Sequence, residues 1–382
     1  MIRASTAAPI ADGRTPLERL KAQPFILGLF LPTQSGGWTP STAPRDTSWH
    51  YDYNAGLTVR ADELGFDLAF ALAQWLGKGG YGGTTKYREQ GIDPLITTAG
   101  LAPLTRNIVL ISTVHVLYGW HPLHLAKMGA TIDHMSNGRW GLNVVTGYVP
   151  TEAPMFGLNH PEHDLRYVIA AEFLQAMEAL WRSDANLTFD GAYYKMKDAF
   201  VTPKPRHGRP IIVNAGSSDA GLDFAARYSD LLFITSPAGA LFEDAVSSLP
   251  DFNRHIKEKG AAVGKKVTTI INPHIICRDT EKEAQDVFRA IAAQEDAEAV
   301  DNLMQSFTKG DNKSFRGHKR DQRIVGGNIQ MIGTPEQIVD GMLRLKAAGC
   351  DGVQINFFDF EPDLEYFGTR VLPLMVQAGL RH

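Results

Sequence analysis

The sequence has very little cysteine and no hydrophobic run long enough to cross a bilayer. Only Cys277 and Cys350 occur among 382 residues, both in apolar surroundings. This argues against a disulfide scaffold and against a zinc site built from several cysteines, and it is typical of a reducing compartment. No stretch reaches the roughly 20 apolar residues of a membrane helix, and the first residues lack the apolar core of a secretory signal. We therefore expect a cytoplasmic protein.

The chain also lacks a strong charge of either sign. Its 38 Lys and Arg residues nearly balance 42 Asp and Glu residues, with a formal net charge of -4. Nothing in this balance favours a nucleic-acid partner. The pairs His121/His124 and His160/His163 are each interrupted by a proline, and no nearby set of carboxylate, His and Cys residues completes a ligand shell. No metal site is expected.

A dinucleotide-binding fingerprint is present only in outline. Gly77, Gly79 and Gly82 satisfy the spacing G-x-G-x-x-G after a strand-like run. The fingerprint also requires a helix that opens at once and an acidic residue at the end of the next strand. Here Gly91 and Pro94 are expected to break any such helix. The sequence therefore does not predict a site for NAD(P)H.

Strand-like and helix-like patterns alternate along most of the chain. Helices are predicted between the strands from 3.6-residue periodicity, for example over Pro122–Met135 and Pro335–Ala348. Eight strands alternating with helices predict one α/β domain over residues 25–382, a (β/α)8 TIM barrel with insertions, preceded by an arm over 1–24. The expected strands are Phe25–Leu31, Leu68–Ala73, Ile108–Thr113, Trp140–Val145, Ile211–Asn214, Leu231–Thr235, Thr268–Cys277 and Gly352–Phe357.

Three connections are longer than an ordinary loop, and such loops often carry function. They cover residues 32–50, 74–91 and 298–327. The third is strongly basic and has two interpretations, a solvated surface segment or a mobile lid that brings cations over an anionic ligand. Its basic residues are Lys309, Lys313, Arg316, Lys319, Arg320 and Arg323.

Polar residues at the expected strand ends indicate a site at the carboxyl-terminal mouth of the barrel. Thr113 closes one strand, and Asn143 lies inside the next. A buried Asn without a partner costs about 1–3 kcal/mol, so its amide is either satisfied by backbone or faces a ligand. Gly216-Ser217-Ser218 follows another strand and opens a helix. This turn has two interpretations, an anion-binding site or an ordinary serine N-cap.

Four stretches together resemble the bacterial-luciferase-like flavin-dependent monooxygenases, over Leu27 to Met375. They read ATIDHMSNGRWGLNVVTGY, AGSSDAG, IGTPEQI and EYFGTRVLPLM. The resemblance implies a (β/α)8 barrel that binds FMN, usually as FMNH2 supplied by a separate NAD(P)H-dependent flavin reductase. It implies oxygenation of a small organic substrate by O2 through a flavin (hydro)peroxide. A homodimer or homotetramer is expected on the same basis.

The resemblance to the pyrimidine ring-opening branch implies a flavin site residue by residue. Thr113 and Asn143 would line the oxygen pocket, and Gln74 stands where that branch has a Lys. Contacts to the flavin ring are implied for Ala73, Gln74, Asn143 and Glu152, and contacts to the ribityl chain and phosphate for Arg166, Tyr167, Gly216, Ser217 and Ser218.

Other stretches resemble the dimethyl sulfone and alkanesulfonate monooxygenases, including HYDYN at 50–54 and DAEAVDN at 296–302. His274 matches a strand-seven His of the alkanesulfonate enzymes and is a candidate acid or base. Their Arg two residues earlier is Asn272 here. A sulfone or alkanesulfonate is therefore the expected substrate, with C–S bond cleavage. Residues expected at the substrate or in the lid are Trp38, Trp120, Arg316, Arg320 and Arg323.

Three alternatives stay open at this point. The same chemistry would also cleave a nitrogen heterocycle, from a pyrimidine to a ring as large as isoalloxazine. A deazaflavin-dependent oxidoreductase and a non-catalytic flavin-binding protein have related folds. The tryptophans of the long loops would stack a planar substrate, or would only pack the lid.

Overall fold

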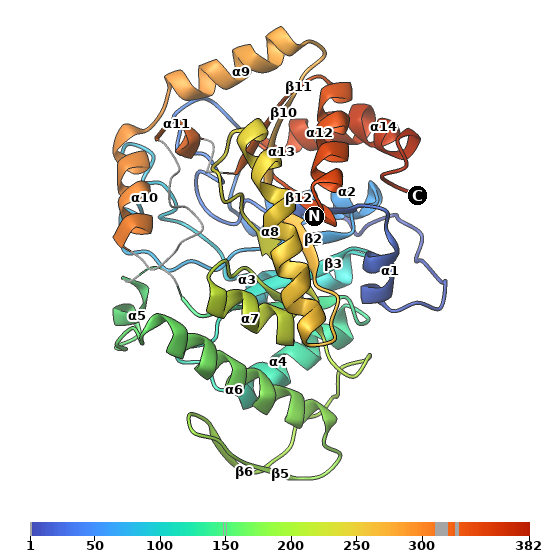
Figure 1. The fold of residues 1–382 in the computed structure, drawn as a ribbon, viewed down its shortest axis with the longest axis vertical. Helices are drawn as coiled ribbons and strands as arrows, with labels where there is room; N and C mark the ends of the chain where they lie inside the picture. Colours follow the sequence, from blue (N-terminus) through green and yellow to red (C-terminus); the bar gives the residue numbers. More distant parts are fainter. Residues whose placement is uncertain (1, 148, 150, 310–319, 325–327) are drawn as a thin grey trace.

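Eight parallel strands close into a barrel, as the sequence predicts (Figure 1). The computed structural model describes residues 2–147, 149, 151–309, 320–324 and 328–382. The strand order around the barrel is β1-β12-β9-β8-β7-β4-β3-β2. These strands are β1 (Ile26–Phe30), β2 (Leu68–Ala71), β3 (Val109–His115), β4 (Trp140–Val145), β7 (Ile211–Asn214), β8 (Leu231–Ile234), β9 (Thr268–Ile271) and β12 (Gly352–Ile355).

The barrel strands are apolar because both of their faces are covered. One face fills the barrel interior, and the other packs against the surrounding helices, which is why these strands read as continuous apolar runs. The helices are α1 (Pro16–Ala22), α2 (Tyr51–Glu63), α3 (Pro94–Leu101), α4 (Pro122–Met135), α5 (Glu152–Met155), α6 (His163–Arg182), α7 (Asp219–Tyr228), α8 (Phe242–Ala262), α9 (Glu281–Ala293), α10 (Ala297–Lys309), α11 (Arg320–Arg323), α12 (Pro335–Ala347), α13 (Phe360–Tyr366) and α14 (Leu372–Gln377).

One predicted strand is in fact two. The run Thr268–Cys277 divides at Asn272 into β9, which belongs to the barrel, and β10 (Pro273–Cys277), which leaves it. β10 pairs in parallel with β11 (Ile329–Gly333) outside the barrel. The division falls at Pro273 because proline has no N–H to continue the ladder and is tolerated at the first residue of a strand. A second pair, β5 (Leu187–Asp190) and β6 (Lys195–Ala199), forms an antiparallel hairpin after α6.

No helix opens directly after Gly77, Gly79 and Gly82 in this described loop, as the sequence predicts, and the next helix begins only at Pro94. Pro94 is the first residue of α3, and the Asp93 side chain accepts a hydrogen bond from the Ile96 N–H. Proline is favoured at this position because its missing N–H would have no partner inside the helix anyway. The glycine-rich loop over 72–93 therefore ends in a helix, but only after a long excursion at the barrel mouth.

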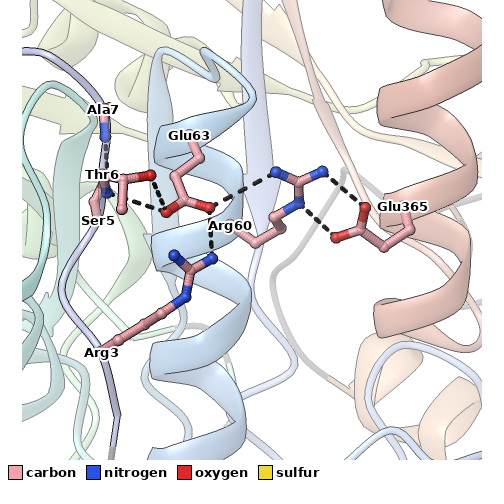
Figure 2. Close-up of polar contacts among 7 residues, drawn as sticks. All are labelled: Arg3, Ser5, Thr6, Ala7, Arg60, Glu63 and Glu365. Atoms are coloured by element: carbon pink, nitrogen blue, oxygen red, sulfur yellow. Dashed lines mark hydrogen bonds and ion pairs between the residues drawn. The ribbon is translucent and has the colours of Figure 1, made fainter.

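The N-terminal arm is tied to the outer helices by a chain of charged groups (Figure 2). The Glu63 carboxylate accepts hydrogen bonds from the Thr6 N–H at 3.0 Å and from Arg3 Nη2 at 3.1 Å. Arg60 lies between Glu63 on α2 and Glu365 on α13, and its Nη2 donates a hydrogen bond to Glu365 Oε2 at 2.8 Å. Because α2 runs antiparallel to its strand, these residues near its carboxyl end lie at the barrel end away from the mouth.

The two cysteines are buried, as their apolar sequence context predicts. Cys277 and Cys350 are buried and unpaired, and burial raises the pKa of each thiol to about 12. They are small core residues rather than reactive groups. Across the described ranges, no helix combines the length and the apolar character that crossing a membrane requires.

Candidate active site

Thr113 and Asn143 meet at the carboxyl ends of adjacent strands. They are register partners on β3 and β4, and Asn143 Nδ2 donates to Thr113 Oγ1 at 3.0 Å. Each is only 1% exposed. Asn143 Oδ1 is buried and has no hydrogen-bond partner among the described residues. The amide nitrogen is thus satisfied by a neighbouring side chain, while the carbonyl oxygen, whose burial costs about 1–3 kcal/mol, is left for a ligand.

A buried carboxylate lies beside this pair. Glu152 in α5 is 0% exposed, and its Oε1 accepts a hydrogen bond from the Trp75 N–H at 3.1 Å. Its Oε2 lies 3.3 Å from His115 Nδ1. His115 stands two residues beyond Thr113 on β3, so both side chains are on the same face of the strand. Burial and the Glu152 charge raise the pKa of Tyr118.

His115 was not predicted as a site residue. The signal was available, because the alternation of a strand places every second residue on one face and His115 follows Thr113 at that spacing. What the sequence could not show is that Glu152, 37 positions later, folds back onto it. Together they place an imidazole and a carboxylate side by side, both buried, on the strand face that carries Thr113.

Arg166 is turned inward from the first turns of α6. Its Nη1 donates to the Gly147 carbonyl and lies 3.0 Å from His160 Nε2. Gly147 has a φ of +81°, and a Cβ there would lie 2.1 Å from the Tyr118 hydroxyl oxygen, so only glycine fits. His160 is thus a partner of Arg166. Nowhere in the described ranges do three or more His, Cys, Asp or Glu residues gather as metal ligands.

The turn after β7 opens a helix toward the mouth. Ser218 is the N-cap of α7, and its Oγ accepts a hydrogen bond from the Gly221 N–H at 3.1 Å. Gly216 is held by Asn214, whose Oδ1 accepts from the Gly216 N–H at 2.8 Å. Added Cβ atoms at Gly216 and Gly221 would lie 3.1 and 2.8 Å from the Tyr167 hydroxyl oxygen. The N-cap interpretation is correct, and it leaves a narrow cradle at a helix N-terminus, where anions bind well.

The residues after β2 form a local network. Ala73 is buried, and the Gln74 carboxamide is engaged on both sides. Gln74 Nε2 donates to the Tyr81 hydroxyl at 2.5 Å, and Gln74 Oε1 accepts from Arg88 Nη1 at 3.1 Å. A glutamine can make both bonds at once, whereas the Lys of the pyrimidine branch could only donate.

The family model for luciferase-like monooxygenases matches residues 26–352 of this chain. The chain belongs to the luciferase-like monooxygenase family. It is 34% identical over 365 residues to a protein named FMNH2-dependent dimethylsulfone monooxygenase from Pseudomonas putida, covering 93% of this chain and 96% of that protein. It is 30% identical to pyrimidine monooxygenase RutA of Acinetobacter baylyi, covering 91% and 94%. The prediction of a flavin-dependent monooxygenase is confirmed at this level.

Solved structures of luciferase-like fold superpose closely. DmoA from Hyphomicrobium sulfonivorans gives a TM-score of 0.79 at 19% identity, covering 94% of this chain and 89% of that one. Riboflavin lyase RcaE, crystallised with modified FMN and riboflavin, gives 0.82 at 20% identity, covering 94% and 92%. At this level of identity the likeness bears on the fold, which agrees with the closed eight-stranded barrel.

In this family member, His274 lies on β10, outside the barrel wall. Asn356 Nδ2 donates to the Pro273 carbonyl at 3.2 Å, so Asn356 Oδ1 faces His274 Nδ1 at 2.6 Å and accepts its proton. Nε2 is then a buried acceptor without a hydrogen-bond partner among the described residues. Burial, and secondarily the charge of Arg45, lower the pKa of His274 to about 4. At neutral pH this ring can accept a proton but is not an acid.

The two predicted stacking tryptophans are packed rather than open. Trp38 is buried, its Nε1 donates to the Phe30 carbonyl at 3.1 Å, and its ring centroid is 3.6 Å from that of Phe30. Trp120 is half-buried against the apolar cluster that contains Phe173. Of the two interpretations of the loop tryptophans, packing is the one observed at these positions.

The two described arginines of the basic segment, Arg320 and Arg323, lie in different surroundings. Arg316 lies outside the described residues. Arg320 is held by acidic neighbours, since its Nη1 donates to both Glu295 oxygens at 2.8 and 2.7 Å and its Nε lies 3.2 Å from Asp301. Arg323 is buried, only 2% exposed. Figure 1 shows α10 and α11 next to each other on one side of the barrel. Arg320 thus links α11 to α10 and to Glu295 just before it, while Arg323 is buried.

Proposed function

We propose that this family member is the oxygenase of a two-component system. It takes FMNH2 from a separate NAD(P)H-dependent flavin reductase and uses O2 to oxygenate a small organosulfur compound, a sulfone or an alkanesulfonate, with cleavage of a C–S bond. The similarity to the dimethylsulfone monooxygenase over 96% of that protein supports the substrate class.

One observation carries the proposal. The Asn143 carbonyl oxygen is buried at the barrel mouth and has no partner among the described residues, beside the Thr113 hydroxyl. A fold retains such a group at a cost when a bound molecule satisfies it. The residues therefore fit a polar ligand beside Asn143. The cradle after β7, the strand next to β4, fits a phosphate.

The chemistry of the site divides between cofactor and protein. When bound, FMNH2 would supply the two electrons that reduce one oxygen atom of O2 to water while the other enters the substrate. Asn143 and Thr113 would orient the reacting oxygen, and the Glu152–His115 pair would hold a proton beside it. Ala73 and Gln74 would contact the flavin ring. The phosphate and ribityl chain would be held by Arg166, Tyr167, Gly216, Ser217 and Ser218.

The test is a reconstituted reaction with a generic flavin reductase, NADH and labelled O2. The substrates are dimethyl sulfone, a straight-chain alkanesulfonate, uracil and riboflavin. The expected result is a labelled oxygen in the carbonyl product of an organosulfur compound. Because a carbonyl oxygen exchanges with water, this product is reduced to the alcohol as soon as it forms. Absence of oxygenated product from every sulfur compound, with FMNH2 binding intact, would refute the proposal.

A second candidate is oxidative opening of a nitrogen heterocycle. The observation that favours it is the 30% identity to RutA, which covers 94% of that protein. The resemblance to that branch also implies Thr113 and Asn143 in its oxygen pocket. The same reaction panel separates the two candidates, because labelled product from uracil or riboflavin alone would select it.

Two further alternatives are separated by spectroscopy. Difference spectra recorded on addition of FMN or of a deazaflavin show which cofactor binds. A deazaflavin-dependent oxidoreductase would respond to the second compound. A non-catalytic flavin-binding protein would bind FMN but yield no product with FMNH2 and O2.

A further inference from the structure

Arg88 is held in an unusual backbone position by the loop after β2. Its φ is +61°, a left-handed conformation that is unfavourable for a residue other than glycine. Its N–H donates to the Ser35 carbonyl at 2.9 Å. Gly80 lies so close that an added Cβ would be 2.3 Å from the Tyr87 carbonyl oxygen. Such strain persists where the surrounding structure enforces it, and it is concentrated at functional positions.

The Arg88 side chain is a buried cation that forms no ion pair with a carboxylate of the described residues. The residue is 9% exposed, and its guanidinium carbon lies 4.6 Å from the Trp38 ring centroid and 5.0 Å from that of Tyr87. Nη1 donates to Gln74, whereas Nε is buried and has no hydrogen-bond partner among the described residues. A buried charge is costly unless it is paired, and within the described part of the chain only neutral groups, the Trp38 ring, the Gln74 amide and the Tyr87 side chain, contact this guanidinium.

Two more arginines lie near Tyr87, the residue next to Arg88 in the chain. Tyr87 is fully buried, and although burial raises its pKa, the charges of Arg88, Arg45 and Arg323 all oppose the rise. Arg323 is 2% exposed, and burial together with the charge of Arg88 lowers its pKa to about 10. Geometry places Arg45 close to this phenol as well, since the Cβ position of Gly36 lies 2.6 Å from the Tyr87 ring and 3.7 Å from Arg45 Nη2. The surroundings of Arg88 are therefore cationic, which favours an anionic ligand over a neutral one.

This cluster lies across the mouth from the phosphate cradle. Trp38 follows β1, and Ser218 follows β7, which is four strands from β1 in either direction around the barrel. The two cationic regions therefore serve different ligands or different parts of one ligand. Arg88 contacts Gln74 at the end of β2, so it adjoins the position proposed for the flavin ring.

We propose that Arg88 binds an oxyanion of the substrate, so that the preferred substrate is an organic anion such as an alkanesulfonate rather than a neutral sulfone. This inference rests on the proposed function. The planar guanidinium offers N–H groups in the fork geometry that matches sulfonate and carboxylate oxygens. The rings of Trp38 and Tyr87 hold its plane in place, so that little freedom is lost when the anion binds.

The probes are butane-1-sulfonate, pentanoate and butyl methyl sulfone, which share an alkyl chain and differ in the head group. Arg88→Met keeps the length of the side chain without its charge, and Arg88→Lys keeps the charge without the fork. Arg60→Gln, at the far end of the barrel, is the matched control. Turnover is measured with FMNH2 from a reductase, and binding by calorimetry with saturating oxidised FMN.

Arg88→Met is expected to raise KM and Kd for butane-1-sulfonate about 30-fold or more, with kcat within threefold, because a charge-assisted bond is lost. For butyl methyl sulfone the change should stay within twofold. Arg88→Lys should give an intermediate loss, and Arg60→Gln should match the wild type. Equal loss with pentanoate would show that any oxyanion is bound, and loss confined to the sulfonate would show selectivity for three oxygens.

Two results would overturn the inference. One is an equal loss with all three probes in both Arg88 variants, which would mean that Arg88 only supports the loop. The other is weakened FMN binding with unchanged butane-1-sulfonate binding, which would assign Arg88 to the cofactor. Arg88-dependent sulfonate binding without any oxygenated product would support the inference while the proposed function failed. Oxygenation of the neutral sulfone alone, unchanged in the Arg88 variants, would support the proposed function and overturn the inference.

Discussion

Replacing the polar pair Thr113/Asn143 by apolar residues of the same shape should stabilise the protein and abolish its reaction. Thr113→Val and Asn143→Leu together remove one hydrogen bond, worth about 0.5–1.5 kcal/mol. They also remove the buried Asn143 carbonyl, whose unsatisfied state costs about 1–3 kcal/mol. The free energy of unfolding should therefore rise by about 1 kcal/mol. Product formation should fall about 100-fold or more, as when a preorganised polar group is removed from an active site.

The assay combines urea unfolding with a product balance. Product and hydrogen peroxide are both measured per FMNH2 consumed, and the double variant should yield peroxide in place of product while FMN binding changes little. Ser112→Ala is the matched control, because Ser112 is adjacent on β3 but accepts a hydrogen bond from Trp140 Nε1 at 2.9 Å and contacts Thr98 at 2.6 Å. This control should lose about 1–3 kcal/mol of stability and keep wild-type coupling.

The reasoning would be refuted by either of two results. If the double variant unfolds about 2 kcal/mol more easily than the wild type, the Asn143 carbonyl is satisfied in the folded protein. If Asn143→Leu alone retains wild-type coupling of product to FMNH2, the pair has no part in the oxygen step.

Three further predictions concern the reductant, a histidine and the insertion. The purified chain alone should be nearly colourless and should not oxidise NADH; rapid oxidation measured at 340 nm, without an added reductase, would contradict the two-component assignment. Burial lowers the pKa of His274 to about 4 from its ordinary value of 6.5, so its contribution to stability is complete above about pH 6.5 and is lost as the pH falls toward 4. Relative to His274→Gln, the wild type should lose about 2–3 kcal/mol between pH 7.5 and 4.5 in urea unfolding, and parallel pH profiles would disprove the buried neutral ring. Arg320→Ala should lower stability by less than about 1 kcal/mol and leave KM for butane-1-sulfonate within threefold, like Glu295→Gln, because the pair is partly exposed; a steep rise in KM would restore a lid role for Arg320.

The sequence alone determined the barrel and the position of its mouth. Apolar runs of β-branched residues, helix caps and glycine stops are local signals, and they are decided by interactions within a few residues. Two of the eight predicted strands, Trp140–Val145 and Ile211–Asn214, have the predicted bounds. The pairing of Thr113 with Asn143 was also within reach, because parallel strands bring their carboxyl ends to one edge.

Only the tertiary structure decided which polar groups meet and which remain without a partner. Arg88 lies in the loop after β2, and its surroundings include Trp38 and Arg323, which are 50 and 235 positions away in the sequence. Arg320 and Arg323 are three residues apart in one basic segment, yet one is paired at the surface and the other is buried. Burial and charge pairing depend on contacts between remote segments, and local residue patterns contain no record of them.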